Sequence, residues 1–126
     1  MDLAIRGRKA LVAASSSGLG LACASALARE GCEVVINGRD PARLEHARQQ
    51  IADTVGVEVR TLCADINTEA GRQTLVQACP QADILVNNNA GPPPGVLADW
   101  DHAAWLAALE ANFLAPVLLI RALLPG

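Results

Sequence analysis

The sequence predicts an α/β fold with a doubly wound parallel β-sheet, and two observations carry this prediction. Short apolar runs alternate with longer helical patterns along the whole chain, in the order β-α-β-α-β-α-β-α. The chain has 126 residues, of which 52% are hydrophobic, which is enough for one core. Because there is no linker, internal repeat or low-complexity tract, we expect one domain over residues 1–126, ending after the helix that follows strand four.

The first half of the chain predicts two strands and two helices in alternation. An apolar run indicates a strand over Lys9–Ala14, and apolar residues at helical spacing indicate a helix over Gly18–Glu30. The next strand is expected over Glu33–Asn37, where the residues have a buried character. Asp40–Pro41 supplies an N-cap followed by proline, so a polar helix begins there and runs to about Val55.

The second half continues the same alternation. Val57–Cys63 alternates like a half-exposed third strand, and a helix is expected from Thr68 to about residue 78. Ile84–Val86 is a fourth, buried strand, which the stiff loop Pro92–Gly95 follows at a short distance. From residue 101 to about 124 the pattern is helical again.

Composition and charge exclude several partners and locations. A net charge of −3, two Trp, one Phe and no Tyr argue against nucleic acid and against an anionic membrane. The N-terminus lacks an apolar signal segment, and the apolar stretch Phe113–Leu124 contains Pro116 and Arg121 and is too short to span a bilayer. We therefore expect a cytoplasmic protein with no membrane partner.

Four cysteines and two histidines offer no metal-ligand pattern. No C-x-x-C pair occurs, and the histidines lie far from any useful ligand spacing, so no metal site is expected. Buried, reduced thiols fit the cytoplasmic assignment.

The first strand–helix connection has the composition of a loop that binds an anion. Parallel strands place the following helix N-terminus at the carboxyl edge of the sheet, where its free N–H groups favour a phosphate. Glycine permits close approach of the backbone, and serine hydroxyls offer further donors. The residues concerned are Ser15, Ser16, Ser17, Gly18 and Gly20. A tight turn without a ligand is the alternative, and the P-loop motif is absent.

The end of the second strand bears on the identity of the nucleotide. NAD-binding folds carry Asp or Glu about 20 residues after the glycines, where it bonds the ribose 2′-hydroxyl. Here Arg39 stands at that place, and a guanidinium suits a 2′-phosphate. The sequence therefore favours NADP over NAD. A solvated arginine beside the N-cap Asp40 is the alternative.

Five stretches of the chain carry a family resemblance. They are Ala13–Gly20, Asn37–Arg39, Asp65–Ile66, Asp83–Gly91 and Glu110–Asn112. Together they resemble the N-terminal half of a short-chain dehydrogenase/reductase with a Rossmann-type, NAD(P)-binding domain, and are most similar to 3-oxoacyl-(acyl carrier protein) reductases. In the order given, they resemble the family's T-G-x-x-x-G-x-G loop, the NADP-type strand end, the adenine pair, the N-N-A-G strand end and the segment with the active-site asparagine. The order and spacing are those of the family, and the match covers essentially the whole chain.

The resemblance implies a set of site residues. Asn112 is the implied catalytic residue. The implied cofactor-binding residues are Ala14, Ser15, Ser16, Ser17, Gly18, Leu19, Gly20, Arg39, Asp65, Ile66, Asn87, Asn88, Asn89, Ala90 and Gly91.

Three departures from the family pattern affect the site. Ala13 replaces the threonine that ties the loop to the fourth strand, so this brace is in doubt. Ala14 replaces the first loop glycine, which is tolerated if its φ is negative. The asparagine run is one residue longer than the motif, so either Asn87–Asn88 or Asn88–Asn89 can pair with it.

Asn112 precedes a proline by four residues. Because the N–H of residue i bonds the carbonyl of residue i−4, and proline has no N–H, Pro116 frees the Asn112 carbonyl. In the family this asparagine helps to hold a water of the proton relay. A plain proline kink in a core helix is the alternative.

The resemblance implies an NADP-dependent reductase that converts a 3-oxoacyl thioester or similar ketone to the alcohol by hydride transfer, with homo-oligomeric full-length relatives. The family's Ser and Tyr-x-x-x-Lys are missing, since the chain has no tyrosine and its one lysine is Lys9. We therefore expect no activity from the chain alone. The alternative is a non-catalytic nucleotide-binding or protein-interaction module, which coding DNA past Gly126 without those residues would support.

Overall fold

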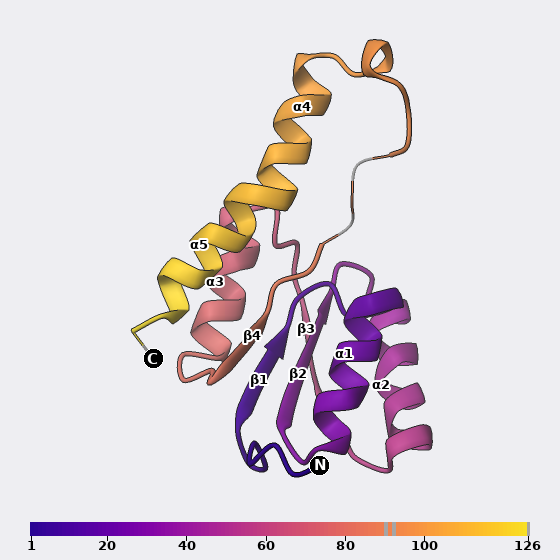
Figure 1. The fold of residues 1–126 in the computed structure, drawn as a ribbon, viewed down its shortest axis with the longest axis vertical. Coiled ribbons are helices and arrows are strands. Elements are labelled where there is room, and N and C mark those ends of the chain that lie inside the picture. The colour runs from indigo at the N-terminus through magenta and orange to yellow at the C-terminus, as the bar shows by residue number, and fades with distance from the viewer. Residues whose placement is uncertain (90, 92, 126) are drawn as a thin grey trace.

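The structure, a computed structural model, describes residues 1–89, 91 and 93–125. Four parallel strands form one sheet in the order β3-β2-β1-β4 (Figure 1). The chain passes outward from β1 to β3 and then returns to the other side of β1, so the strand order reverses between β1 and β4. In doubly wound sheets ligands bind at such a switch point. The strands are β1 (Lys9–Val12), β2 (Glu33–Gly38), β3 (Arg60–Cys63) and β4 (Ile84–Val86).

Helices cover both faces of this sheet (Figure 1). Alternate residues of β1 point to opposite faces, so Ala10 and Val12 pack in the core under α1 and α2, while Leu11 packs with Leu75 and Leu119 of α3 and α5. The α/β prediction is therefore confirmed. The helices are α1 (Gly18–Arg29), α2 (Pro41–Val55), α3 (Glu69–Ala78), α4 (His102–Leu109) and α5 (Ala115–Leu123).

The predicted helix starts are confirmed by their caps. The Asp40 carboxylate accepts from the Ala42 N–H at 2.9 Å, with Pro41 in the first turn of α2. The Thr68 hydroxyl accepts from the Gly71 N–H at 3.0 Å and begins α3.

Two strands are shorter than predicted. β1 ends at Val12 because the next residues turn into the first loop. β3 begins at Arg60 instead of Val57, because side-chain contacts with α2 replace the strand ladder before it. Val59 is buried in the α1–α2 core, and the Glu58 carboxylate accepts from Arg48 at 2.6 Å.

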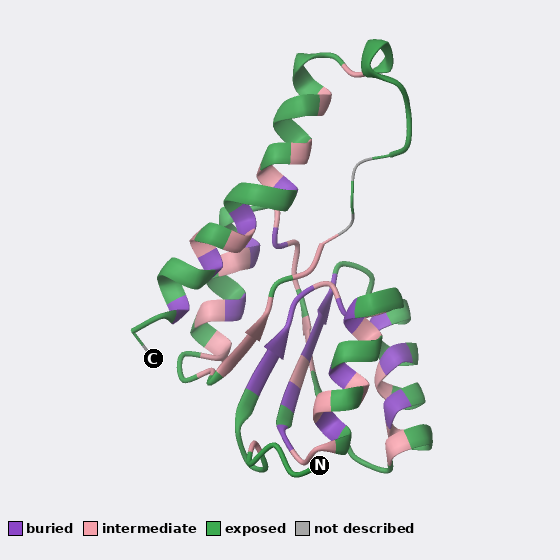
Figure 2. Ribbon diagram, in the orientation of Figure 1, coloured by how far each residue is buried: buried purple, intermediate pink, exposed green. Residues whose placement is uncertain are grey.

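The final helical pattern is one continuous helix that includes a π-helical turn. This turn, Glu110–Leu114, joins α4 to α5 and is called the π segment below. By length and composition alone the resulting helix, His102–Leu123, could cross a membrane, although core helices of soluble proteins pass the same test. The stretch Phe113–Leu124 is too short by itself, but it is part of this longer helix, which begins at His102 and continues through Pro116. Most of α4 is exposed (Figure 2).

The four cysteines are free thiols. Cys32 is buried and Cys79 is half-buried, but Cys23 and Cys63 are exposed, which corrects the expectation of buried thiols. Cys23 is an exposed residue of α1, and Cys63 ends the edge strand β3.

Candidate functional site

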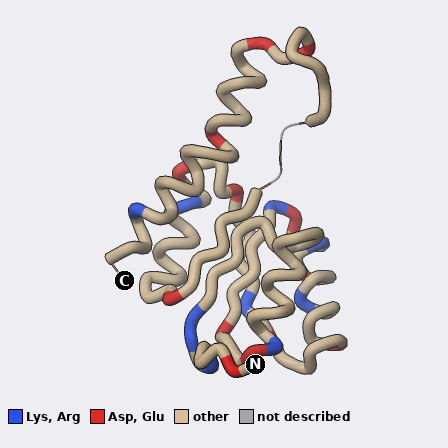
Figure 3. The backbone as a smooth tube through the Cα atoms, in the orientation of Figure 1, with Lys and Arg blue, Asp and Glu red and all other residues tan. Residues whose placement is uncertain are grey.

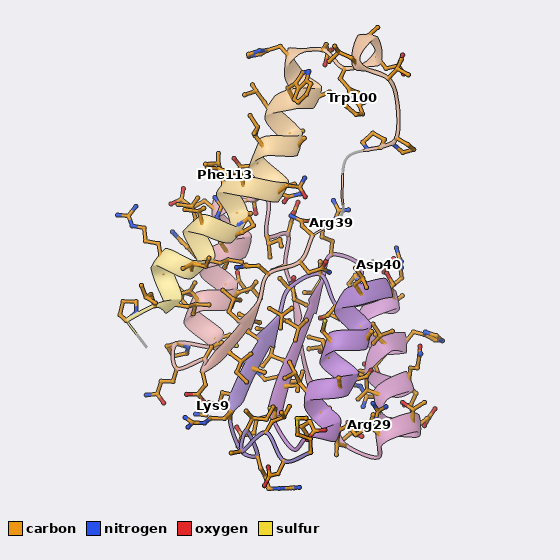
Figure 4. All side chains as sticks on the ribbon, viewed as in Figure 1. Lys9, Arg29, Arg39, Asp40, Trp100 and Phe113 are labelled. Carbon is orange, nitrogen blue, oxygen red and sulfur yellow. The ribbon has the colours of Figure 1, made fainter. Side chains whose placement is uncertain are left out.

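A cavity of about 610 Å³, called the first cavity below, opens at the carboxyl edge of the sheet. Arg39 and Asp40 lie at this edge, and Lys9 and Arg29 lie at the opposite one (Figure 4). Because the strands are parallel, the residues that follow β1, β2, β3 and β4 meet at this edge and line the cavity. The lining residues are Ala14, Ser16, Ser17, Leu19, Asn37, Gly38, Arg39, Asp40, Arg43, Ala64, Asp65, Ile66, Asn88 and Asn89.

Ala14 has a left-handed backbone conformation, with φ at +47°. The condition under which the extra methyl group would be tolerated, a negative φ, is therefore not met, and the conformation is costly for a residue with a Cβ. Two asparagines fix it. The Ala14 N–H donates to Asn37 Oδ1 at 3.1 Å, and the Ala14 carbonyl accepts from Asn88 Nδ2 at 2.9 Å.

These same contacts supply the brace that Ala13 was expected to lack. The Ala13 N–H donates to the Val86 carbonyl at 3.1 Å, and the Asn88 side chain reaches the loop from just beyond β4. On the other side, Asn37 Nδ2 donates to the carbonyls of Leu62 and Ala64 at 3.0 and 3.1 Å. The loop is therefore tied to β4 and β3 without a threonine.

The three serines of the loop have different surroundings. Ser15 is fully buried; its hydroxyl donates to the Val12 carbonyl at 2.8 Å and accepts from the Asn37 N–H at 2.9 Å. It therefore braces the loop and is not a donor for a phosphate, contrary to the sequence prediction. Ser16 and Ser17 do line the first cavity.

The two loop glycines are required for different reasons. Gly18 has φ at +58° and open space where a Cβ would stand. At Gly20 a Cβ would collide with the Ala14 carbonyl oxygen and lie 2.8 Å from Asn88 Nδ2. Glycine thus lets α1 pack directly on the loop. The N-cap residue Ser17 makes no side-chain capping hydrogen bond, which leaves first-turn N–H groups for an anion.

Two arginines line the cavity beside the loop. Arg39 is exposed at the end of β2, as predicted. Arg43, in the first turn of α2, donates to the Ser17 hydroxyl at 3.3 Å. Sequence reasoning missed Arg43, although its spacing of four residues from Arg39 could have indicated a second cation nearby.

Asp65 and Ile66 lie where predicted, in the loop after β3. Asp65 Oδ1 accepts from the Asn67 N–H at 2.9 Å, and the Asp65 carbonyl accepts from the Thr68 hydroxyl at 2.8 Å. A Cβ at Gly71 would collide with that carbonyl, so α3 packs closely against the loop.

The asparagines after β4 differ in exposure. Asn87 is exposed and is not among the residues that line the first cavity, whereas Asn88 and Asn89 line it. Ala90 lies outside the described residues. Gly91 lines a second cavity, of about 390 Å³, next to Trp100 and Asn112.

The π segment changes the prediction made for Asn112. The Ala115 N–H bonds the Glu110 carbonyl, five residues back, so the backbone has the π register at this point. The residue five before Pro116 is Ala111, so Pro116 leaves the Ala111 carbonyl without its helical donor. The prediction for the Asn112 carbonyl assumed the α register, which the backbone does not have at Ala115.

Asn112 itself is exposed and lies apart from the first cavity. Its Nδ2 donates to the Ala108 carbonyl at 3.0 Å, and its side chain lines the second cavity. Among the described residues there is no group of three or more His, Cys, Asp or Glu that could hold a metal ion.

The strand order, the switch point and the cleft at the carboxyl edge define a Rossmann-type domain. The chain belongs to the short-chain dehydrogenase family, whose sequence model, described as "short chain dehydrogenase", matches residues 8–126.

Similar proteins include oxidoreductases from several bacteria. The chain is 38% identical to the uncharacterized oxidoreductase YvaG of Bacillus subtilis, covering 96% of this chain and 46% of that protein. It is 32% identical to the D-beta-hydroxybutyrate dehydrogenase of Cupriavidus necator, covering 97% and 48%. The chain thus spans about half the length of the curated relatives it matches.

Solved structures show the same fold. The L-sorbose reductase of Gluconobacter frateurii, complexed with NADPH and L-sorbose, superposes with a TM-score of 0.92 at 34% identity, covering 100% of this chain and 49% of that one. The RhlG/NADP complex of Pseudomonas aeruginosa has a TM-score of 0.86 at 30% identity, covering 96% and 48%.

Proposed function

We propose that this chain forms the nucleotide-binding half of an NADP-dependent oxidoreductase that interconverts a ketone and an alcohol. The observation that carries the proposal is the first cavity, whose wall combines Ser17 and Leu19, at the uncapped start of α1, with the two arginines Arg39 and Arg43. Neighbouring structures complexed with NADPH or NADP support a nicotinamide nucleotide as the ligand.

The residues of the cavity fit the parts of such a nucleotide. The start of α1 at Gly18 would hold the pyrophosphate, since its N–H groups lack a side-chain cap. Arg39, with Arg43 beside it, would hold a 2′-phosphate, and Asp65–Ile66 would hold the adenine. We assign the N-N-A-G motif to residues 88–91, because Asn88 and Asn89 face the cavity and the residue before them does not.

The nicotinamide, when bound, supplies or accepts the hydride. In this chain Asn112 is the candidate catalytic residue, and the remaining site residues bind and orient the nucleotide. No tyrosine is present, and Lys9 lies at the edge of the sheet opposite Arg39 (Figure 4). We therefore propose that the chain alone does not reduce acetoacetyl thioesters; clear NADPH oxidation by the purified chain would contradict this.

The finer assignments follow from the family resemblance. We propose a 3-oxoacyl thioester or similar ketone as substrate, a cytoplasmic location, and homo-oligomers for the full-length relatives. The names of two relatives give small molecules as their substrates, D-beta-hydroxybutyrate and L-sorbose.

The 3-oxoacyl proposal is tested by measuring the rates at which a catalytically active chain reduces 3-oxoacyl thioesters and sugar ketones.

Calorimetric titration with NADPH and NADH tests the cofactor proposal. We expect NADPH to bind at least about tenfold more tightly, because a guanidinium–phosphate pair contributes more than 1.4 kcal/mol. Arg39→Gln should remove the difference, and Arg29→Gln, at the far edge of the sheet, should keep it. Equal or tighter NADH binding by the unmodified chain would overturn the preference.

A further inference from the structure

A pair of asparagine side chains joins the two cavities. Asn89 lines the first cavity and Asn67 lines the second, and Asn89 Nδ2 donates to Asn67 Oδ1 at 2.7 Å. The same amide group donates to the Ala111 carbonyl at 2.9 Å. Asn89 thus connects the end of β4, the loop after β3 and the π segment.

The Ala111 carbonyl is the one that Pro116 leaves without a helical donor. A buried carbonyl without a partner is unfavourable, and Ala111 is buried. The Asn89 amide replaces the missing N–H with a donor from outside the helix. The π register and this hydrogen bond therefore support each other, and π turns of this kind occur at functional sites.

A second contact ties the start of the π segment to the same loop. Arg72 Nη1 donates to the Ile66 carbonyl at 3.0 Å and to the Glu110 carboxylate at 3.2 Å. The Arg72 side chain is 12% exposed and the Glu110 side chain 37%, so the arginine end of this ion pair is largely shielded from solvent. Asn89 and Arg72 therefore each bridge the loop after β3 and the π segment, which carries Asn112. Asp65 and Ile66 of that loop line the first cavity.

We propose that Asn89 is a positioning residue that fixes the π register of residues 110–114 and couples it to nucleotide bound in the first cavity. The coupling part rests on the proposed function. A shift from the π to the α register moves each later residue by about 100° around the helix axis, which would turn Asn112 relative to the second cavity. A nucleotide that holds Asp65 and Asn89 in place would thereby hold Asn112 as well.

Amide hydrogen exchange measured by NMR on the 126-residue chain tests the positioning. Asn89→Ala should speed exchange at the Leu114 and Ala115 amides by about fivefold, since a hydrogen bond contributes about 1 kcal/mol. Asn87→Ala, which removes a neighbouring exposed amide, is the matched control and should leave these rates within twofold. Equal rates in the two variants would overturn the proposal.

Two further variants keep the test decisive. The double variant Asn89→Ala, Pro116→Ala restores a backbone N–H to the helix and should recover most of the protection at Ala115, which a general loosening of the fold would not allow. Should Asn89→Ala fail to fold, Asn67→Ala removes the acceptor of the same pair and should speed the same amides. Unchanged exchange in Asn67→Ala would then contradict the proposal.

NADP⁺ is the probe for the coupling. At concentrations that saturate the signals of Gly18 and Gly20, it should slow exchange at Leu114 and Ala115 in the unmodified chain and not in Asn89→Ala. Binding without any slowing in the unmodified chain would overturn the coupling. If NADP⁺ does not bind at all, the proposed function fails, while the comparison without nucleotide still decides the positioning role.

Discussion

At the scale of single residues, the first loop uses an unfavourable residue in a strained position and stabilises it from both sides. Ala14 has a positive φ, and the side chains of Asn37 and Asn88 hold its N–H and its carbonyl. Strain of this kind persists where the surrounding contacts over-determine the backbone. The loop is therefore kept in shape by its neighbours and not by its own sequence.

Replacing Ala14 by glycine should stabilise the chain. Ala14→Gly removes the steric cost of the left-handed conformation, and we expect the free energy of unfolding to rise by about 0.5–1 kcal/mol, measured by urea denaturation. Ala13→Gly is the control, because Ala13 is buried and has no positive φ. It should lower stability by about 1–2 kcal/mol. Loss of stability in Ala14→Gly would contradict the strain argument.

The thiols should differ in reactivity with their surroundings. Burial raises the pKa of Cys79, although Arg60 opposes this, and burial with the Glu30 charge raises the pKa of Cys32. A raised pKa lowers the fraction of thiolate at pH 8, so these two thiols should be alkylated slowly at that pH. Their alkylation rate should continue to increase as the pH is raised further. Iodoacetamide labelling followed by mass spectrometry should show the exposed Cys23 and Cys63 modified first. Modification of Cys32 as fast as that of Cys23 would be evidence against this order.

At the scale of elements, the sequence predicted what depends on local pattern and missed what depends on the topology. The helices α1, α2 and α3 begin where caps and glycines indicate, because these signals lie in the element itself. The roles of Asn37 and Asn88 as braces could not be predicted, since their partners lie more than 20 residues away. The π segment was missed because proline spacing alone does not distinguish the α from the π register.

The packing of α1 on the loop gives a prediction for Gly20. In Gly20→Ala the new methyl group must displace the Ala14 carbonyl or the Asn88 amide, so we expect a loss of about 1–3 kcal/mol in stability and weaker NADPH binding. Thermal unfolding and titration measure both effects. Leu19→Ala is the control for stability, because Leu19 is 79% exposed. A Gly20→Ala variant as stable as the control would show that the loop can yield.

At the scale of the whole molecule, the side of the chain that carries α4 and α5 has much uncovered apolar surface. Glu110 and Arg121 are the only Asp, Glu, Lys or Arg residues between His102 and Leu123, and Figure 3 shows how sparse charge is along this helix. In the described part of the chain β4 is also an edge strand, paired with β1 alone. Exposed apolar faces and strand edges favour association. The exposed large side chains of the helix are Trp105, Leu106, Leu109, Phe113, Leu114, Val117 and Ile120.

We therefore expect the chain to self-associate. Its sedimentation coefficient should rise with concentration in the micromolar range, and the double variant Phe113→Ser, Ile120→Ser should reduce this rise. Leu3→Ser changes an exposed leucine outside the helix and is the control. A chain that sediments as a monomer at all concentrations would refute the expectation.

The central claim is that the cleft at the carboxyl edge of the sheet is a nucleotide site, and NMR chemical-shift mapping with NADP⁺ tests it most directly. The account predicts saturable shifts that cluster at residues 16–20, Arg39, residues 65–66 and residues 88–89. Shifts that cluster at the opposite edge, around Lys9 and Glu33, or shifts that do not saturate, would contradict it.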